Sequence, residues 1–331
     1  MKAFVLNTYA GQLHETDVAE PTVGDNDVLI RVQAAGLNML DEKVRAGEFK
    51  QILPYRLPQI MGNDVAGTVI AVGSGVRGFV VGDEVYGRPD QARIGTFAER
   101  IAVAERDVAL KPASITIEEA GSLPLVALTA WQALVELGDV QPAQKVLIHA
   151  GAGGVGSIAI QLAKHLGASV ATTVSASNAD FVRELGADIV IDYHTQDFEQ
   201  VLTGYDFVLD SVGGENLDKS LRVLRRGGIA VGISGPPDPA FAARVGLNAV
   251  LRLAIAGISA TVRRKAKKLG VRYQFLFMRA HGDQLREITA LVDAGVLRPI
   301  VGKTVPFEQT ATALSTLESS GTRGKVVMVN P

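Results

Sequence analysis

The run HAGAGGVG at residues 149–156 carries the clearest chemistry in the chain. Its spaced glycines, Gly151, Gly153 and Gly156, match the pattern G-x-G-x-x-G between an apolar run that predicts a strand and a segment that predicts a helix. Glycines let the backbone turn sharply and approach a pyrophosphate closely, and a helix N-terminus presents free N–H groups to phosphates. A tight turn without a ligand would show the same glycines, but the flanking strand and helix favour a dinucleotide site.

The end of the next predicted strand indicates which dinucleotide binds. About 20 residues after the glycines, NAD sites carry an acidic residue for the ribose hydroxyls, whereas residues 172–178 read TTVSASN. The hydroxyls of Ser175 and Ser177 and the amide of Asn178 can donate to a 2′-phosphate, which a carboxylate would repel. Ser177 or Asn178 could also cap the following helix. The two roles are compatible, and the lack of a carboxylate favours NADPH.

Other residue types with catalytic potential are scarce or scattered. The sequence has no cysteine, so disulfides, thiolate metal sites and cysteine nucleophiles are excluded. Its five histidines do not cluster, so no metal site is expected, and His149 is interpreted as structural. No Gly-x-Ser-x-Gly motif is present, so acyl-transfer hydrolysis has no support.

Composition indicates a folded protein of two domains. The chain has 331 residues, of which 47% are hydrophobic and 21% charged. The formal net charge of −2 gives no footprint for nucleic acid. No run of about 18 uncharged apolar residues predicts a membrane span, and the first residues lack the apolar core of a secretory signal. A cytoplasmic location is therefore expected.

The elements that must position these residues follow two patterns. Short runs with Gly and Asp turns indicate strands in residues 1–35 and 60–110. A helical segment is predicted at 116–138, and strands then alternate with helices from 146 to 233. This alternation predicts an α/β fold with a doubly wound parallel sheet.

The C-terminal part returns to the first pattern, with a helix predicted at 285–294 and a strand at 325–329. A nucleotide-binding domain is therefore inserted into a β-rich domain. We predict residues 123–266 for the inserted domain, and residues 1–122 plus 267–331 for the other.

The chain resembles a known family over nearly its whole length. The shared motifs are 35–38 (AGLN) with Asp41 and 45–47 (RAG), 62–67 (GNDVAG), 81–87 (VGDEVYG), 123–124 (LP), 128–131 (LTAW), the glycine loop, 210–214 (DSVGG) and 324–327 (GKVV). They resemble the zinc-free quinone oxidoreductase branch, which includes zeta-crystallin-like proteins, of the medium-chain dehydrogenase/reductase superfamily. Residues 273–278 (YQFLFM) are most similar to its alkenal/enone reductase subgroup. The resemblance implies a Rossmann domain inserted into a GroES-like domain.

The resemblance also implies a reaction. Zinc members of the family place Cys at the position of Asn38 and a His-Glu pair at Asn63 and Asp64. Without those ligands, the expected activity is zinc-independent transfer of a hydride from NADPH to quinones or to the C=C bond of α,β-unsaturated carbonyls, with the cofactor bound between the domains. The alternatives are a non-catalytic, crystallin-like NADPH-binding protein and an NADP-dependent alcohol or aldehyde oxidoreductase. The expected partner is a small molecule, and a homodimer is left open.

Candidate catalytic residues come from the family's cleft positions. They are Asn38, which can donate a hydrogen bond to the substrate carbonyl, Asp41, which needs a raised pKa to act as an acid, and Tyr55. Asp41 and Asp64 can also be structural partners of backbone groups in turns. Because water can protonate a delocalised enolate, we expect no single one of these side chains to be essential.

The motif and the resemblance together predict the cofactor contacts. They are Thr129, Gly151, Ala152, Gly153, Gly154, Val155, Ser175, Ser177, Asn178, Tyr193, Ser211, Val212, Ile233, Ser234, Leu276, Phe277 and Lys325. Phe277 can equally belong to the core of a strand. Lys325 is expected either to touch phosphate or to be a solvated surface charge. Residues 236–272 combine apolar and basic residues, so they can lie on a membrane. A solvated helix beside the cofactor cleft, serving as a lid or a subunit contact, is favoured there.

Overall fold

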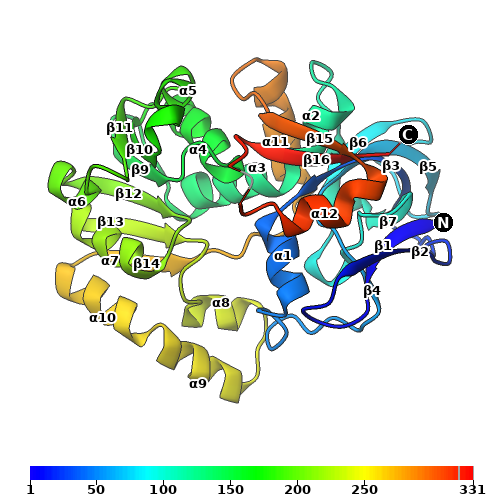
Figure 1. Ribbon diagram of the computed structural model, residues 1–331, viewed down its shortest axis with the longest axis horizontal. Helices are drawn as coiled ribbons and strands as arrows, with labels where there is room; N and C mark the ends of the chain where they lie inside the picture. The colour runs from blue at the N-terminus through cyan, green and yellow to red at the C-terminus, as the bar shows by residue number, and fades with distance from the viewer. Residues whose placement is uncertain (320, 331) are drawn as a thin grey trace. The chain divides into compact units, whose positions relative to one another are not determined.

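The chain divides into two compact units in the computed structural model, which describes residues 1–319 and 321–330 (Figure 1). One unit comprises Met1–Leu128 with Arg279–Pro331, and the other comprises Thr129–Met278. The second unit is therefore a continuous segment that interrupts the first. We refer to them as the split unit and the inserted unit.

A six-stranded parallel sheet forms the centre of the inserted unit, in the order β11-β10-β9-β12-β13-β14. Its strands are β9 (Lys145–His149), β10 (Ser169–Val174), β11 (Ile189–Asp192), β12 (Tyr205–Asp210), β13 (Leu224–Gly232) and β14 (Arg272–Phe275). Numbered from β9, this order is 3-2-1-4-5-6, that of the Rossmann fold. The middle strands are nearly continuous apolar runs because helices cover parallel sheets on both faces.

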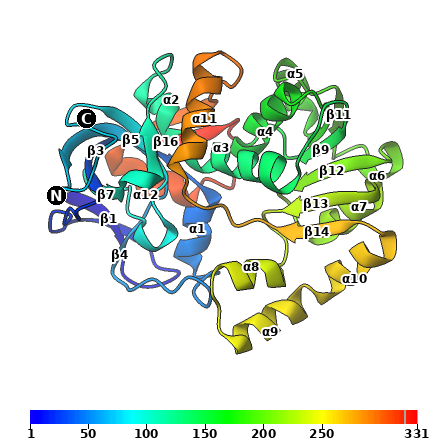
Figure 2. The ribbon, with the colours of Figure 1, turned by 180° about the vertical axis from the view of Figure 1, so that it is seen from behind.

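Helices connect these strands and cover the sheet. They are α4 (Gly154–His165), α5 (Ala179–Glu184), α6 (Phe198–Val201), α7 (Gly214–Val223), α8 (Pro239–Arg244), α9 (Ala249–Ile258) and α10 (Ala260–Leu269), with the short 3-10 turn η4 (Ala176–Asn178). Leu217 and Leu221 of α7 and Val262 of α10 pack into a core with Leu147 and Val208 of the strands. Figure 2 shows α8, α9 and α10 in sequence along one edge of this unit.

Antiparallel sheets dominate the split unit. The larger sheet has the order β15-β16-β3-β5-β6-β8, with β7 paired to β3, and the smaller has the order β2-β1-β4. The strands are β1 (Lys2–Leu6), β2 (Leu13–Asp17), β3 (Asp27–Leu37), β4 (Gln59–Ile60), β5 (Val65–Val72), β6 (Glu84–Gly87), β7 (Arg100–Ala104), β8 (Val108–Leu110), β15 (Val301–Pro306) and β16 (Lys325–Val329). The antiparallel pairing of β16 with β3 joins the C-terminal segment to the N-terminal one.

Short helices flank these sheets. They are α1 (Met39–Ala46), α2 (Ile117–Gly121), α11 (Gly282–Asp293) and α12 (Thr310–Ser315), with the 3-10 turns η1 (Gln91–Arg93), η2 (Glu105–Asp107) and η5 (Phe307–Gln309). A shared core joins both segments of the unit, since Phe4, Ile30 and Val65 pack in one cluster with Val305 and Met328. The predicted α/β fold, with a Rossmann sheet inserted into a β-rich domain, is confirmed.

Two predicted boundaries differ from the structure. The single helix predicted at 116–138 is three pieces: α2, then α3 (Pro124–Trp131), then a π-helical turn, η3 (Gln132–Leu137). Proline has no N–H group with which to continue α2, so a new helix begins at Pro124.

The second difference concerns the end of the inserted domain. The predicted boundary at residue 266 falls inside α10, whereas the inserted unit runs to Met278. The reason is β14, which pairs in parallel with β13 and so extends the Rossmann sheet by one strand. At the start, the unit begins at Thr129 rather than at residue 123.

Candidate functional site

The glycine loop lies between β9 and α4, and its glycines have different reasons to be glycine. A Cβ on Gly156 would lie 2.3 Å from the carbonyl oxygen of Ala150, and one on Gly151 would lie 2.2 Å from Oγ1 of Thr172. These two are required by the fold itself. A Cβ on Gly153 would meet only the Ala150 oxygen, at 3.3 Å. The protein alone therefore leaves more room at Gly153, as expected if a ligand approaches the backbone there.

The N-terminus of α4 follows directly from this loop. The N-cap residue is Gly153, which has no side chain to accept a hydrogen bond from the first turn. Ala152, Gly154 and Val155 are partly exposed. Twelve residues of helix thus direct a positive dipole end and uncapped N–H groups to a partly exposed loop, which suits a pyrophosphate.

A small polar cluster follows the end of β10. The hydroxyl oxygens of Ser175 and Ser177 lie 3.1 Å apart, and Nδ2 of Asn178 donates to Oγ of Ser175 at 3.1 Å. The Asn178 side chain, at the N-cap of α5, forms no capping hydrogen bond, so the interpretation of Asn178 as a helix cap is wrong, whereas that of Ser177 stays a prediction. These side chains interact with one another instead, at the place where a 2′-phosphate is expected.

Other predicted cofactor residues follow the carboxyl ends of neighbouring strands, which meet at one edge of a parallel sheet. The Tyr193 ring, after β11, is 58% exposed and lies against His194. The Ser211 hydroxyl, after β12, donates to the carbonyl of His149 at 3.2 Å, and Val212 is 57% exposed. Tyr193 and Val212 thus present apolar surface at this edge.

The remaining predicted contacts are distributed over β13, β14 and α3. Ile233 and Ser234 follow β13 and are partly exposed. Leu276 is buried after β14, and the Phe277 ring lies 5.9 Å from that of Phe241. Thr129 is buried in α3, so it lies on a helix and not at the strand ends.

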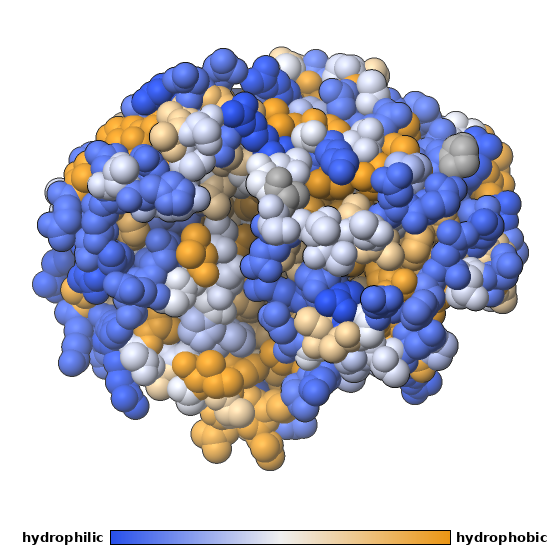
Figure 3. All heavy atoms as spheres, viewed as in Figure 1, coloured by the Kyte–Doolittle hydropathy of each residue, from blue (hydrophilic) through white to orange (hydrophobic). Residues whose placement is uncertain are grey.

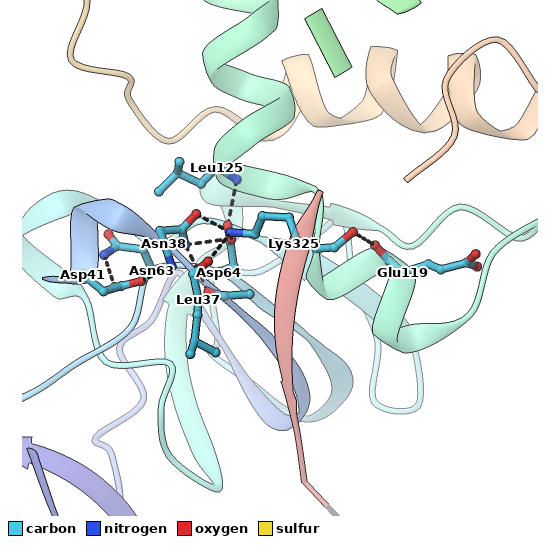
Figure 4. Close-up of polar contacts among 10 residues, drawn as sticks. Leu37, Asn38, Asp41, Asn63, Asp64, Glu119, Leu125 and Lys325 are labelled. Carbon is cyan, nitrogen blue, oxygen red and sulfur yellow. Dashed lines mark hydrogen bonds and ion pairs between the residues drawn. The ribbon is translucent and has the colours of Figure 1, made fainter. Parts of the chain in front are cut away.

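A second polar cluster is buried in the split unit (Figure 4). The ammonium group of Lys325, on β16, donates to the carbonyl of Leu37 at 2.7 Å, to Oδ1 of Asn38, and to Oδ2 of Asp64 at 3.3 Å. The Lys325 side chain is 6% exposed and Asp64 is fully buried. Lys325 is therefore not the predicted surface charge. Its three N–H donors are all taken within the unit, and the contact with phosphate stays a prediction.

Asp41 extends this cluster from the first turn of α1. Its carboxylate accepts the backbone N–H of Asn38 at 2.8 Å and Nδ2 of Asn63 at 2.7 Å. Burial raises the pKa of Asp41 from 3.8 to about 6, and the neighbouring Asp64 adds to the rise, whereas Asn63 and Lys325 oppose it. Burial also lowers the pKa of the Lys325 ammonium, against the pull of the two carboxylates.

The candidate catalytic side chains all have partners inside the protein. Both Nδ2 hydrogens of Asn38 are used, by the Gly36 carbonyl at 3.0 Å and by Asp64 at 2.9 Å. Asn38 thus has no spare donor for a substrate carbonyl. Asp64 also accepts the backbone N–H of Leu125, at the start of α3, at 2.7 Å. Asp41 is thus a partner of a backbone group in a local turn, as expected, whereas the backbone partner of Asp64 lies far along the chain, at the start of α3.

Tyr55 lies outside this cluster. Its hydroxyl donates to the carbonyl of Gln91 at 2.8 Å, and burial raises its pKa to about 12 against the influence of Arg88. A phenol with that pKa is a weaker acid than the free side chain. The structure thus brings Asn38 and Asp41 together and leaves Tyr55 apart from them.

Arg88, which the sequence interpretation did not include, is fully buried in the same unit. Its Nη1 donates to the Pro89 carbonyl at 2.9 Å, while its Nε has no hydrogen-bond partner among the described residues. Burial lowers the pKa of this guanidinium, and Tyr55, Asp90, Asp64 and Asp41 oppose that shift electrostatically. An arginine directly after a strand and before a proline was the available signal in the sequence.

The described residues offer neither a metal site nor a membrane-spanning helix. In that part of the chain, no group of three or more His, Asp or Glu side chains is arranged to hold a metal ion. None of its helices combines the length and apolar character that crossing a bilayer requires.

Each unit contains residues that match a known protein family. Residues 24–113 match the model of the alcohol dehydrogenase GroES-like domain, and residues 185–328 match that of the zinc-binding dehydrogenase family. The NADPH-dependent alkenal/one oxidoreductase of Arabidopsis thaliana chloroplasts is 36% identical, over 99% of this chain and 79% of the relative.

Solved structures agree over the full length. A quinone oxidoreductase from Coxiella burnetii has a TM-score of 0.83 at 32% identity, with 99% of each chain covered. The Escherichia coli quinone oxidoreductase complexed with NADPH has a TM-score of 0.81 at 26% identity, covering 99% of this chain and all of that one. The chain belongs to the quinone oxidoreductase branch of the medium-chain dehydrogenase/reductase superfamily, among the relatives of the alkenal/one oxidoreductases.

Proposed function

We propose that this protein is an NADPH-dependent reductase of quinones or of the C=C bond of α,β-unsaturated carbonyls. The observation that carries the proposal is the glycine loop between β9 and α4, followed at the end of β10 by a hydroxyl and amide cluster without a carboxylate. The names of the relatives, an NADPH-dependent alkenal/one oxidoreductase and quinone oxidoreductases, support this substrate class.

The residues of the inserted unit fit the cofactor. The loop from Gly151 to Val155 would hold the pyrophosphate, while Ser175 and Asn178 would donate to the 2′-phosphate. NADPH, when bound, supplies the hydride for the reduction. We expect Gly153→Ala to weaken NADPH binding while thermal stability is retained, because the new Cβ would meet only the Ala150 oxygen within the protein. Gly156→Ala, by contrast, would disturb the loop itself.

Selectivity for NADPH over NADH can be tested by introducing a negative charge where the 2′-phosphate is expected. We expect kcat/KM for NADPH to exceed that for NADH by at least about tenfold, which is about 1.4 kcal/mol. Ser175→Asp should narrow or reverse this ratio through repulsion of the 2′-phosphate, and Ser169→Asp, an exposed serine at the opposite end of β10, is the matched control. Equal efficiencies with both cofactors in the wild type would contradict the proposal.

The donor set in the split unit favours zinc-independent chemistry. Amides, carboxylates and an ammonium group stand together there, and the ammonium of Lys325 already neutralises the carboxylate of Asp64. A divalent cation would have to displace that ammonium group. Activity should therefore survive chelators, and one tightly bound zinc per chain whose removal abolishes activity would contradict this part of the proposal.

Protonation is proposed to come from water. Because the partners of Asn38, Asp41 and Tyr55 are all within the protein, Asn38→Ala, Asp41→Asn and Tyr55→Phe should each keep kcat within about a hundredfold of wild type. A loss beyond about 10⁴-fold in one of them, with the fold and NADPH affinity intact, would identify an obligatory acid.

Arg88 is our proposed donor to the substrate oxygen, since its buried guanidinium has more N–H groups than partners. Arg88→Met should lower kcat by about a hundredfold to a thousandfold, with Arg88→Lys intermediate. An unchanged kcat in a folded Arg88→Met variant would remove Arg88 from the mechanism.

The decisive experiment is NADPH consumption with phenanthrenequinone and with an acrolein-type enone. Turnover with either one supports the proposal and indicates the preference. NADPH binding without turnover would favour a non-catalytic, crystallin-like protein. Turnover with alcohols or aldehydes alone would favour an alcohol oxidoreductase.

A further inference from the structure

Helix α9 exposes an apolar face. Val250, Leu253 and Ile258 are 77%, 76% and 63% exposed, and the exposed Ala254 and Gly257 lie between them on the helix. Positions 250, 253, 254, 257 and 258 follow the spacing of one helix face. We refer to these five residues as the α9 stripe. In Figure 3, hydrophobic atoms gather at the lower edge of the molecule, over α9.

The exposed side of α9 is apolar, unlike that of an ordinary surface helix. The inner side of α9 is already used, since Ile255 is 4% exposed and Ser259 is buried. A helix at a protein surface normally turns its apolar side inward and its polar side to water. Because α9 is apolar on both sides, its exposed side is expected to meet a second apolar phase.

Basic residues surround the α9 stripe. Residues 239–272 contain eight Lys or Arg and no Asp or Glu, so all 35 acidic residues of the chain lie elsewhere. Outside this segment, 25 Lys and Arg face 35 Asp and Glu, a formal charge of −10. The segment is thus strongly basic in a protein whose remainder is acidic.

The cations of α10 are exposed and mostly unpaired. Lys265 forms an ion pair with Asp218. Arg264, Lys267 and Lys268 are exposed without an ion pair among the described residues, as is Arg252 of α9. Val262 and Ala266 bury the inner side of α10 in the core of the inserted unit, so these exposed cations can meet anions.

An apolar stripe on α9 and exposed cations on α9 and on the adjoining α10 together match one partner in both respects. An anionic lipid surface offers hydrocarbon to the stripe and phosphate or carboxylate groups to the cations. Nucleic acid would satisfy the cations and gain nothing from aliphatic side chains. A second copy of this chain would bring eight further cations to the same face, at the cost of repulsion.

We propose that α9 and α10 form a membrane-docking surface, in which the α9 stripe enters the headgroup region of an anionic bilayer and the cations of α10 contact its lipids. The helices lie on the membrane and do not cross it. This surface is built from residues that the proposed reductase activity does not use.

The test is sedimentation of the full-length protein with vesicles. Vesicles of phosphatidylcholine mixed with phosphatidylserine should bind the protein, with affinity falling as salt rises, and vesicles of phosphatidylcholine alone should bind it at least about tenfold more weakly. Val250→Glu with Leu253→Glu should reduce binding by about tenfold or more. Val80→Glu with Val81→Glu, which changes an equally exposed pair in the split unit, should not.

Charge reversal on α10 tests the contribution of its cations to vesicle binding. Arg264→Glu with Lys268→Glu should weaken binding about tenfold or more, and Lys50→Glu with Lys303→Glu, an exposed pair elsewhere, should have little effect. All variants should retain NADPH-dependent turnover of a soluble quinone, which separates this proposal from the proposed function.

Three results would overturn the proposal. The first is absence of binding to the anionic vesicles at low salt. The second is full binding by the Val250→Glu and Leu253→Glu variant, which would show that the stripe does not enter the bilayer. The third is a dimer that dissociates in this variant, without vesicle binding by the wild type, which would assign the stripe to a subunit contact.

Discussion

The split unit and the inserted unit each bury a polar cluster, and the two clusters are stabilised differently. In the split unit, the Lys325 ammonium faces the carboxylate of Asp64. In the inserted unit, Asp210 is fully buried and forms no ion pair among the described residues. It accepts neutral donors: Ser220 at 3.0 Å and the backbone N–H groups of Val212 and Gly213 at 3.0 and 2.6 Å. In the first cluster one ammonium group faces buried carboxylates, whereas in the second the buried carboxylate is bonded by neutral donors.

The clusters also differ in how they titrate. His149 belongs to the second cluster, with its Nδ1 at 3.0 Å from Thr173 and its Nε2 at 3.0 Å from Ser220. Burial lowers the pKa of His149 from 6.5 to about 4, while Asp210 opposes that shift. Asp41, in the first cluster, has its pKa raised to about 6. Acid therefore destabilises one cluster, and base destabilises the other, within nearly the same pH range.

Removal of the Lys325 ammonium group should have the largest effect on stability. Lys325→Met leaves the buried Asp64 without its counter-ion and the Asn38 amide oxygen without its donor, and we expect a loss of about 3–5 kcal/mol in the free energy of unfolding. Lys303→Met, an exposed lysine on the neighbouring β15, should cost far less. Denaturant unfolding checks this, with hydrogen exchange of β3 and β16 as the local measure. Similar losses in the two variants would contradict the central role of Lys325.

The loss of stability at acid pH is expected to depend on His149. Since its pKa is lower in the folded state than its ordinary 6.5, its contribution to stability is present above that value and is lost as the pH falls toward about 4. The shift corresponds to about 3 kcal/mol over the full range. His149→Gln cannot titrate, so its stability should fall less than that of the wild type between neutral pH and pH about 4. Parallel pH profiles of the two proteins would exclude this role.

The loss of stability as the pH rises is expected to depend on Asp41. Since its pKa is higher in the folded state than its ordinary 3.8, its contribution is present below that value and is lost as the pH rises through about 6. This also amounts to about 3 kcal/mol at most, slightly less than for His149. The stability of Asp41→Asn relative to wild type should therefore rise from acid to neutral pH. A constant difference between the two proteins would show that Asp41 keeps an ordinary pKa.

The cluster around Asp210 should tolerate the loss of one bond. Ser220→Ala removes the hydroxyl between His149 and Asp210, but other donors to Asp210 remain, so we expect a loss of about 1–2 kcal/mol. Thermal unfolding measures it, and Ser114→Ala, a serine in the split unit whose hydroxyl bonds the exposed Asp293 carboxylate, is the control. A loss as large as that of Lys325→Met would remove the difference between the clusters.

The inserted unit could be predicted because its signals are local. Each strand and its helix are close in the sequence, and the glycine loop lies between two of them. Residues 273–278 are compatible with a strand, but the sequence does not assign it to this sheet, because β14 follows a long helical segment and pairs at the edge of the sheet. The insertion of one domain into the other was predicted because the strand-rich pattern returns near the C-terminus.

The cluster of the split unit could be predicted only in part. Asn38, Asp41 and Asp64 belong to motifs that the sequence places in one domain. Lys325 lies 287 residues from Asn38 along the chain, and its burial depends on the pairing of β16 with β3. An isolated lysine in a charged context reads as solvated. Arg88 was missed for the same reason, although its place directly after a strand and before a proline was an available signal.

The split arrangement also has a consequence during protein synthesis. Lys325 is made 261 residues after Asp64, an interval of roughly 13 to 50 seconds at typical translation rates. For that time, the N-terminal strands have neither β16 nor the ammonium group that neutralises their carboxylate. The inserted unit, one continuous segment, can fold in the meantime. On the ribosome, the domain whose synthesis begins first is therefore completed last. The edge of β3 that pairs with β16 stays unpaired and exposed to chaperones and to neighbouring chains throughout that delay, although β5 and β7 can already pair with β3.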